Sequence, residues 1–400
     1  MDTKVENMTV SQQLQIPFEE IIENLGIPSN YDFYKLKKLY LPNNPLTDLP
    51  LFLTSKSNVV NRSRVRFKER MKGTDKSLLP NVDYSDLVYQ MGSFTIKSDM
   101  DYGLPDEFDG QVFDCLLMLI SKEYVEKSRV FRGYRIDETI ILNEFVRTGQ
   151  YKKNGALYNR IKSSLDRLYH TKYVIQEESI KKKGEINYVE ILYNLVDGIY
   201  RKGKKIKNAD GSVNYLDHTV VLPNSLITTA IEDKQYKIIA NEKRYALSRY
   251  ISKVIYDKLH IVLYAQIFSP GKEIFIAQKA GSYPYFVIGY QKFCERVGIP
   301  IKEEKNPSRV KEQLDSYVNE LKEQNLIIDM EAEPSENQNT SVNLVFIFNW
   351  LFVDYVFQMA NKTMDSMGIN DISNDMVVSY FSKMERQIKT KKIKEKITNT

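Results

Sequence analysis

The feature of this sequence that most limits its fold is a run of three amphipathic helical segments followed by two short strands. Residues 106–125, 138–150 and 152–172 place apolar side chains at the three- and four-residue intervals of a helix face. YVIQEES and INYVEILYNLV then alternate as strands do, and IKKKGE joins them with a turn at Gly184. The expected product is a helical unit that ends in a β-hairpin.

The same order recurs in the second half of the chain. RYALSRYISKVIYDKLHIVLYAQIF, PYFVIGYQKFCERVG and NPSRVKEQLDSYVNELKEQNL predict three helices, and IIDMEA and SVNLVFIFNW predict two strands. The halves share element order and not residue identity. Because this order is typical of a winged helix, we expect a mainly α chain with small β-sheets (α+β), built from two tandem winged-helix domains.

Changes in composition predict the domain boundaries. The expected parts are an N-terminal extension over 1–85, a first winged-helix domain over 86–198 that opens with a strand at 86–99, a basic linker over 199–215, a second winged-helix domain over 216–360, and a C-terminal helix and basic tail over 361–400. The linker is expected to be mobile because it is polar, contains glycine and carries five cations in seven residues. These are Arg201, Lys202, Lys204, Lys205 and Lys207.

Neither export nor a membrane partner is expected. MDTKVENMTV lacks the apolar core of a signal peptide. The most apolar run, residues 342–359, contains two asparagines and one aspartate, so a strand followed by a buried helix is expected instead of a membrane span. Cys115 and Cys294 lie far apart in apolar-periodic segments, and we expect both to be buried thiols in the cytoplasm.

Catalytic and metal-binding patterns are also missing from the sequence. No G-x-x-x-x-G-K-[ST] loop occurs, and His170, His218 and His260 are isolated, so they are expected at surfaces or interfaces and not as metal ligands. Acids gather in SDMDYGLPDEFDGQVFD, where the start of a helix favours carboxylates and a Mg²⁺ site is the weaker interpretation. We expect a binding protein that is not an enzyme, with no cofactor and no metal; a nicking enzyme that uses a tyrosine is the disfavoured alternative.

The third helical segment of the first half combines an apolar stripe with positive charge. Leu157, Ile161, Leu165 and Leu168 recur at helical spacing, while residues 152–172 carry six cations and one acid, an excess equal to the formal +5 of the whole chain. One interpretation is a solvated basic face. The other is a DNA-binding helix, because the third helix of a winged helix enters the major groove and its N-terminus offers amides to phosphate.

We expect DNA contacts from this helix and from the hairpin tip that follows it. The expected contact residues are Lys152, Lys153, Asn154, Asn159, Arg160, Lys162, Ser163 and Arg167 on the helix and Lys181, Lys182 and Lys183 at the tip. The equivalent helix of the second half carries three cations and four acids over 308–323. Any contact there would come from its N-terminal end, and packing or dimerisation is the alternative. The residues concerned are Ser308, Arg309, Lys311 and Gln313.

The segment FTIKSDMDYGLPDEFDGQVFDCLLMLISKE resembles the plasmid replication initiator protein A family. The matched residues are Tyr102, Gly103, Leu104, Pro105, Phe108 and Asp109. PLTDLPLF is similar to the family's N-terminal PL element, and SRVKEQLDSYVNELKEQNLI is similar to its C-terminal helix–strand junction. At that junction Gln324 and Asn325 stand where a glycine is common. The resemblance covers residues 45–350.

This resemblance implies a sequence-specific binder of double-stranded DNA, of plasmid or phage origin. Such a protein would recognise origin repeats, help to open adjacent AT-rich DNA, and recruit a host initiator and helicase. In related initiators monomers typically start replication and dimers repress it, so a homodimer is a further expected state. A winged-helix transcriptional regulator is the alternative.

Overall fold

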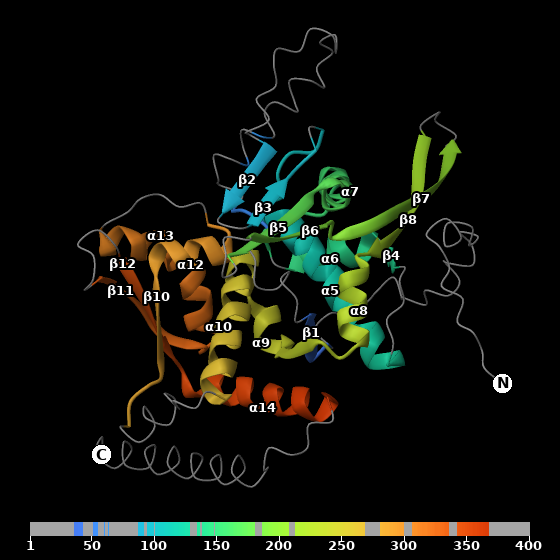
Figure 1. Cartoon of the computed structure of the whole chain (residues 1–400). Coiled ribbons are helices and arrows are strands. Elements are labelled where there is room, and N and C mark those ends of the chain that lie inside the picture. The colour runs from blue at the N-terminus through green and yellow to red at the C-terminus, as the bar shows by residue number, and fades with distance from the viewer. Residues whose placement is uncertain are drawn as a thin grey trace, which may run out of the picture.

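The structure, a computed structural model, describes residues 36–42, 51–54, 60, 63, 87–91, 94–99, 101–128, 134–136, 138–147, 149–180, 186–207, 213–268, 281–299, 306–335 and 342–367. Helices and small antiparallel sheets are combined in these residues, which confirms the expected α+β class (Figure 1). No helix within the described ranges has both the length and the apolar character that a membrane crossing requires.

Helix α5 (Glu107–Lys127) is the central helix of the first half. Asp106 caps it in a capping box, because its Oδ1 accepts the amides of Phe108 and Asp109 while Asp109 Oδ2 accepts the amide of Asp106. Most of α5 is buried. The capping box shows why acids gather in this segment, and it confirms the helix-start interpretation of the acidic cluster.

Helices α6 (Glu138–Arg147) and α7 (Gly155–His170) follow α5, as expected. Gly149 lies between them with φ of 72°, in the left-handed region that favours glycine. The apolar stripe of α7 is buried as its spacing predicts, and α7 packs against α5. The buried residues of this stripe are Leu157, Ile161, Leu165 and Leu168.

A four-stranded antiparallel sheet adjoins these helices. Its order is β2 (Val88–Met91), β3 (Phe94–Lys97), β5 (Lys172–Ile180) and β6 (Ile186–Tyr193). Strands β5 and β6 form the predicted hairpin. The single strand expected over 86–99 is wrong, because Met91 pairs with Phe94 and β2 folds back on β3.

The basic segment 199–215 is largely paired strand, so the expectation of a mobile linker is wrong. Val196–Lys207 forms β7, which pairs antiparallel with β8 (Val213–Pro223), and β4 (Tyr134–Ile136) pairs with the other edge of β8. The lysines and glycines of this segment have no apolar period, so local sequence does not indicate a strand. Backbone pairing with β8 creates it. The domain boundaries themselves stay predictions.

The second half opens with two helices where one long helix was expected. Helix α9 (Asn241–Ala246) ends before α10 (Tyr250–Phe268) begins. In the break, the amides of Ser248 and Arg249 both donate to the carboxylate of Glu320. This carboxylate from a distant helix satisfies donors that a continuous helix would have bonded internally.

The next expected helix, PYFVIGYQKFCERVG, is also only partly helical. Its first part is strand β10 (Tyr285–Gly289), and α12 (Tyr290–Val297) ends as expected at Gly298, which has φ of 77°. Helix α13 (Pro307–Glu323) is capped by Asn306. Beyond it lies a three-stranded antiparallel sheet of order β10-β12-β11.

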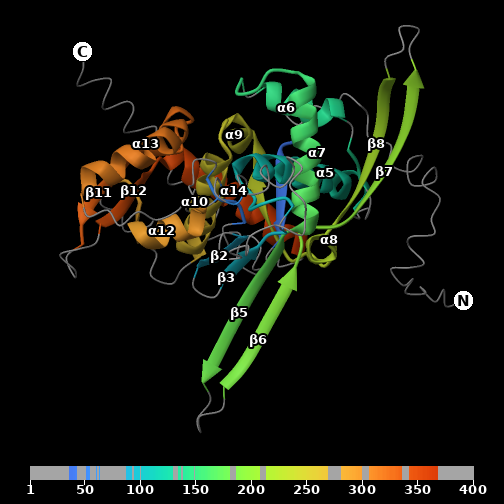
Figure 2. The same ribbon diagram turned by 90° about the horizontal axis from the view of Figure 1, so that it is seen from above.

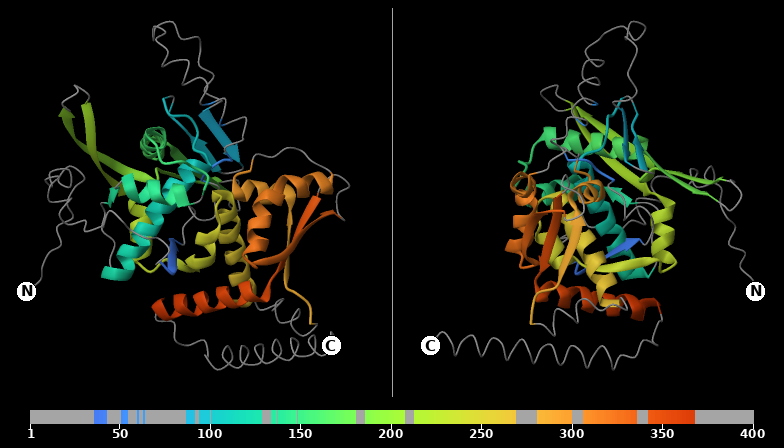
Figure 3. Two further views of the ribbon diagram at one scale, coloured as in Figure 1. Left: turned by 180° about the vertical axis from the view of Figure 1, so that it is seen from behind. Right: turned by 60° about the vertical axis from the view of Figure 1, so that its left-hand side comes forward.

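The remaining predicted strands of this half are present. They are β11 (Ile327–Pro334) and β12 (Val342–Phe348), and β12 is followed by helix α14 (Trp350–Met367), which buries one of its faces. This order confirms the strand-and-helix interpretation of residues 342–359. Figure 3 shows α14 on the side of the molecule opposite to α12 and α13.

Described residues of the N-terminal extension touch both halves. Strand β1 (Lys38–Pro42) pairs with β9 (Tyr236–Ala240), which follows helix α8 (Ser225–Glu232). Leu53 bridges to Asp106 at the start of α5, and the neighbouring amide of residue 54 donates to the carbonyl at the end of α12. One continuous apolar core runs through both halves, so this extension is part of the folded unit.

Candidate nucleic-acid interface

Helix α7 begins at the surface with a capped, acid-free first turn. Asn154 Oδ1 accepts the amide of Leu157 at 2.8 Å. Lys152, Lys153 and Asn154 are exposed. A helix N-terminus carries partial positive charge and amides without helical acceptors, so this end of α7 is suited to a phosphate.

Aromatic rings orient two further cations of α7. The Arg160 guanidinium carbon lies 3.9 Å from the ring centroid of Phe108 on α5 and 5.5 Å from that of Tyr151. Lys162 Nζ lies 4.5 Å from the ring centroid of Tyr158, one turn earlier. Exposed cation–π contacts contribute roughly 0.5–1 kcal/mol each. They narrow the range of positions of these side chains while Arg160 stays exposed.

Asn159 and Ser163 complete the outer surface of α7, and both are exposed. Ser163 Oγ donates to the backbone carbonyl of Asn159 at 3.0 Å. Seen from above in Figure 2, α7 lies on the near side of the molecule, and two β-ribbons, β5–β6 and β7–β8, leave the body near one end of it. Polar side chains and cations therefore share one accessible helix surface.

Arg167 is not on this outer surface, which corrects the prediction. Its Nη1 pairs with Asp109 Oδ1 at 2.5 Å, and its Nε donates to the Tyr102 carbonyl at 2.8 Å. The side chains of Arg167 and Asp109 are 12% and 0% exposed. Helical spacing placed Arg167 beside the apolar stripe, but spacing alone could not reveal a partner on another helix.

The residues that carry the family resemblance hold α7 in position. The Tyr102 ring stacks on His170 at the end of α7, with centroids 4.6 Å apart. Gly103 has φ of 70°, a conformation that favours glycine, in the turn where the Tyr102 carbonyl meets Arg167. Asp109 both completes the α5 cap and pairs with Arg167. The motif thus supports the helix and does not itself face outward.

Strand β7 borders α7 through an ion pair that sequence reasoning missed. Arg201 Nη1 lies 2.8 Å from Asp166 Oδ1, the one acid within residues 152–172. The signal in the sequence is the run of cations at 201–207, which sequence reasoning assigns to a linker. Strand pairing with β8 instead places the start of this run beside α7.

The predicted DNA contact of the β5–β6 hairpin tip cannot be placed. Lys181, Lys182 and Lys183 lie outside the described residues. The described strands β5 and β6 form a ribbon that extends away from the body of the molecule in Figure 2. Within it, Gln176 Nε2 donates to Glu190 Oε1 at 2.8 Å.

Helix α13 lies on the same side of the molecule as α7 (Figures 1 and 2). Ser308, Arg309 and Gln313 are exposed near its N-terminal end. Gln313 Oε1 accepts the Tyr290 hydroxyl at 2.9 Å, and Lys311 Nζ lies 3.8 Å from a carboxylate of β11. The structure brings the two predicted helices to one face, and a DNA contact by α13 stays a prediction.

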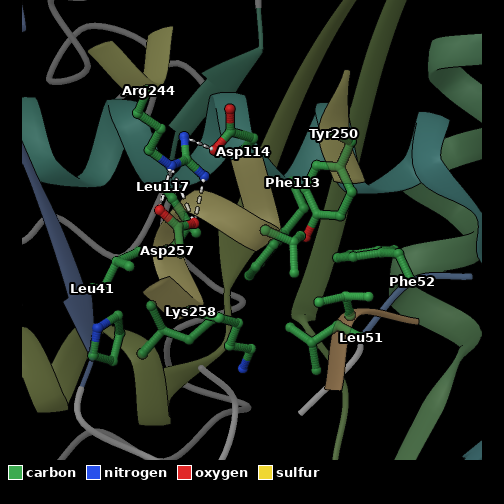
Figure 4. A pocket seen from close by; sticks show the side chains of 14 residues that line it. Leu41, Leu51, Phe52, Phe113, Asp114, Leu117, Arg244, Tyr250, Asp257 and Lys258 are labelled. Atoms are coloured by element: carbon green, nitrogen blue, oxygen red, sulfur yellow. Dashed lines mark hydrogen bonds and ion pairs between the residues drawn. The ribbon is translucent and has the colours of Figure 1, made fainter. Parts of the chain in front are cut away.

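A buried ion cluster joins the two halves beneath this face (Figure 4). Arg244 of α9 pairs with Asp114 of α5 at 2.6 Å and with Asp257 of α10 at 2.8 Å. Lys253 Nζ lies 2.9 Å from Asp114. The adjoining cavity of about 60 Å³ has room for a few water molecules. We therefore interpret the cluster as structural.

The described part of the chain contains no group of three His, Cys, Asp or Glu side chains that could hold a metal ion. The surface or interface position expected for His260 is wrong, because it is 1% exposed and packs near the rings of Tyr256 and Phe352. Burial, with a smaller effect from Lys237, lowers the pKa of His260 to about 3.

Stability is therefore expected to fall as the pH drops below about 6.5, the ordinary pKa of histidine. The unfolded chain takes up a proton there, whereas folded His260 stays neutral until about pH 3. Unfolding free energy should decrease by roughly 1.4 kcal/mol per pH unit from this group. Urea unfolding at pH 7, 6 and 5 should show this component in the wild type and not in His260→Leu. Equal pH slopes in the two proteins would contradict it.

Comparison with known proteins assigns no family to the chain. No protein-family model matches it, and the search of curated proteins finds no match. A solved structure of domains 2 and 3 of RctB, a selenomethionine derivative, is 10% identical with a TM-score of 0.36, and covers 65% of this chain and 89% of its own. A second structure of RctB domains 2–3 is 11% identical with a TM-score of 0.33, at 67% and 92% coverage. Likenesses at these scores do not establish a common fold.

Proposed function

We propose that this protein is a replication initiator of plasmid or phage origin that binds double-stranded DNA with α7 in the major groove. The observation that carries the proposal is the capped and acid-free N-terminal half of α7, with exposed Arg160 on the helix and exposed Lys152 and Lys153 just before it. Cations position a protein on phosphates, and polar groups such as those of Asn159 and Ser163 read base edges. Helix α7 offers both kinds of group on one surface.

The proposal includes two winged-helix units. In the second half, α10, α12 and α13 accompany the sheet β10-β12-β11, and in the first half α5, α6 and α7 precede the hairpin β5–β6. The third helix of such a unit is the groove-binding one, which makes α7 and α13 equivalent. The acids of α13 outnumber its cations over 308–323, so α7 supplies most of the affinity.

The later steps of the proposed function rest on the resemblance to the plasmid replication initiator protein A family. In this proposal the protein binds origin repeats in the cytoplasm, promotes opening of adjacent AT-rich DNA, and recruits a host initiator and helicase, with a homodimer as a second state. It acts by binding and not as an enzyme. A plasmid that carries the gene with its flanking DNA should replicate. If that plasmid is lost while the protein still represses its own promoter, the transcriptional regulator is correct.

Removing the cations of α7 is expected to abolish tight DNA binding. The variant Lys152→Ala, Lys153→Ala, Arg160→Ala and Lys162→Ala removes four phosphate partners. Affinity for DNA flanking the gene should fall by about 10³-fold at 0.15 M salt, and the slope of log K against log salt should become shallower by about 3.6. Fluorescence anisotropy across a salt series measures both quantities.

A matched control removes four exposed lysines from other elements of the chain. They are Lys37, Lys127, Lys234 and Lys362. This control lowers the net charge by the same amount, so it should weaken binding far less if α7 is the site. An equal loss in both variants would contradict the α7 site. Failure of the wild type to prefer flanking DNA over random DNA would contradict the proposed function.

A further inference from the structure

We propose that the ribbon β7–β8 is a second DNA-contacting arm, which binds the phosphate backbone beside the groove that α7 enters. This inference rests on the proposed function and assigns to the same DNA a contact outside the helix and its hairpin. Figure 2 shows β5–β6 and β7–β8 leaving the body in different directions from near one end of α7. A duplex lying on α7 can therefore also meet β7–β8.

The two ribbons differ in charge. Residues 198–207 of β7 contain five cations and no acid, and β8 contributes one acid, Asp217. Strands β5 and β6 together contain one lysine and three glutamates. The charge of β7–β8 therefore matches a polyanion along its length, whereas the acids of strands β5 and β6 outnumber their single lysine.

Backbone pairing gives β7 a defined course away from the body. Its register with β8 continues without a shift from Gly198↔Leu222 to Lys207↔Val213. At the base of the ribbon, a Cβ on Gly198 would lie 3.2 Å from the Leu222 side chain, so the strands approach closely there. A paired ribbon holds its residues at fixed intervals along its length, which a mobile linker does not.

The ion pair to α7 places the start of β7 beside the helix. Arg201 reaches Asp166 on α7, and the paired backbone of β7 continues from Arg201 to residue 207. At roughly 3.3 Å per residue, Lys207 is about 20 Å farther along the strand than Arg201. The cationic part of β7 thus continues well beyond α7. Its length exceeds the roughly 12 Å width of the major groove.

These positions favour duplex DNA as the occupant. The start of β7 lies beside α7, so one rod-shaped polyanion can contact both elements without a conformational change in the protein. Lysines on a strand position phosphates and carry no base-reading pattern, so the arm should strengthen binding to every sequence by a similar factor.

Tethered cleavage tests the placement of the arm. Cys115 and Cys294 are 1% and 0% exposed, so an iron chelate will attach selectively to an added surface cysteine in the folded protein. Lys153→Cys, just before α7, and Lys207→Cys, at the end of β7, should both cut bound DNA, at positions displaced from each other along the duplex. Lys362→Cys, on α14 at the opposite side, should not cut. Cleavage from Lys153→Cys without cleavage from Lys207→Cys would overturn the arm.

A charge-removal series provides the second readout. The variant Lys202→Gln, Lys204→Gln, Lys205→Gln and Lys207→Gln keeps Arg201 and its pair with Asp166. It should weaken binding to flanking DNA and to random DNA equally, by about 10²- to 10³-fold at 0.15 M salt. The four corresponding Lys→Arg changes should keep binding, which separates charge from ribbon folding.

The outcomes distinguish the arm from the proposed function. Full affinity in the Gln variant, together with loss of binding in the α7 variant, overturns the arm and leaves DNA binding by α7 intact. Loss in both the Gln and the Arg variants means that the ribbon matters only for folding, and it also overturns the arm. A wild-type protein without DNA affinity overturns both proposals.

Discussion

Replacing Arg244 with methionine is expected to destabilise the protein by at least 3–5 kcal/mol, the usual cost of removing one partner from a buried ion pair. Arg244 holds Asp114 and Asp257, and the Asp114 side chain is 1% exposed. Burial alone would raise the pKa of Asp114, but Arg244 and Lys253 outweigh it and lower that pKa. Without Arg244, Asp114 keeps only Lys253 and Asp257 loses its paired guanidinium, so one of these carboxylates must take up a proton or become solvated.

Chemical denaturation at pH 7 measures this effect. Because domains are typically stable by only 5–15 kcal/mol, Arg244→Met should be partly or fully unfolded at 37 °C. Arg249→Met is the matched control, since Arg249 is 38% exposed and pairs with Glu320 at 3.5 Å. It should cost less than about 1 kcal/mol. A similar small loss for Arg244→Met would show that the cluster does not hold the halves together.

Loss of Arg167 is expected to have the second largest effect. Arg167→Ala removes the guanidinium that pairs with Asp109, a side chain that is 0% exposed and also accepts the Asp106 amide. It also leaves the Tyr102 carbonyl without its guanidinium donor. We expect a loss of about 3–5 kcal/mol in unfolding free energy, and a displacement of α7 relative to α5.

Arg160→Ala separates this structural role from DNA binding. Arg160 lies on the same helix but is exposed and touches the rings of Phe108 and Tyr151. Its loss should reduce stability by less than about 1 kcal/mol while weakening DNA binding. Urea unfolding and anisotropy on both variants give the comparison. If Arg167→Ala retains wild-type stability and loses only DNA affinity, Arg167 contacts DNA and its internal pairing is not what matters.

Sequence reasoning was most accurate where local signals decide the structure. The four-residue spacing of Leu157, Ile161 and Leu165 predicted the buried face of α7, because helical periodicity alone determines which residues share a face. The acids around Asp106 predicted a helix start, because capping joins residues only three apart. The charge contrast between the α7 and α13 segments was likewise readable from composition.

The wrong sequence predictions concern positions whose structure depends on a residue far away in the chain. Strand β7 exists because β8 pairs with it, and the break before α10 is bonded by Glu320 from α13. Arg167 points inward because Asp109, 58 residues earlier, lies buried beside it. His260 is in the core because three-dimensional packing surrounds it with apolar rings. None of these partners follows from spacing along the chain.

The sequence by itself thus determined the α+β class, the principal helices of the first half, the Asp106 cap and the position of a basic helix at 152–172. Only the tertiary structure decided which of its cations face outward, that a basic ribbon stands beside it, and that a buried ion cluster joins the halves. The physical reason is the distance along the chain between the groups that interact. Periodicity and capping act within a few residues, whereas desolvated charges and strand pairing depend on groups that meet only after the chain has folded.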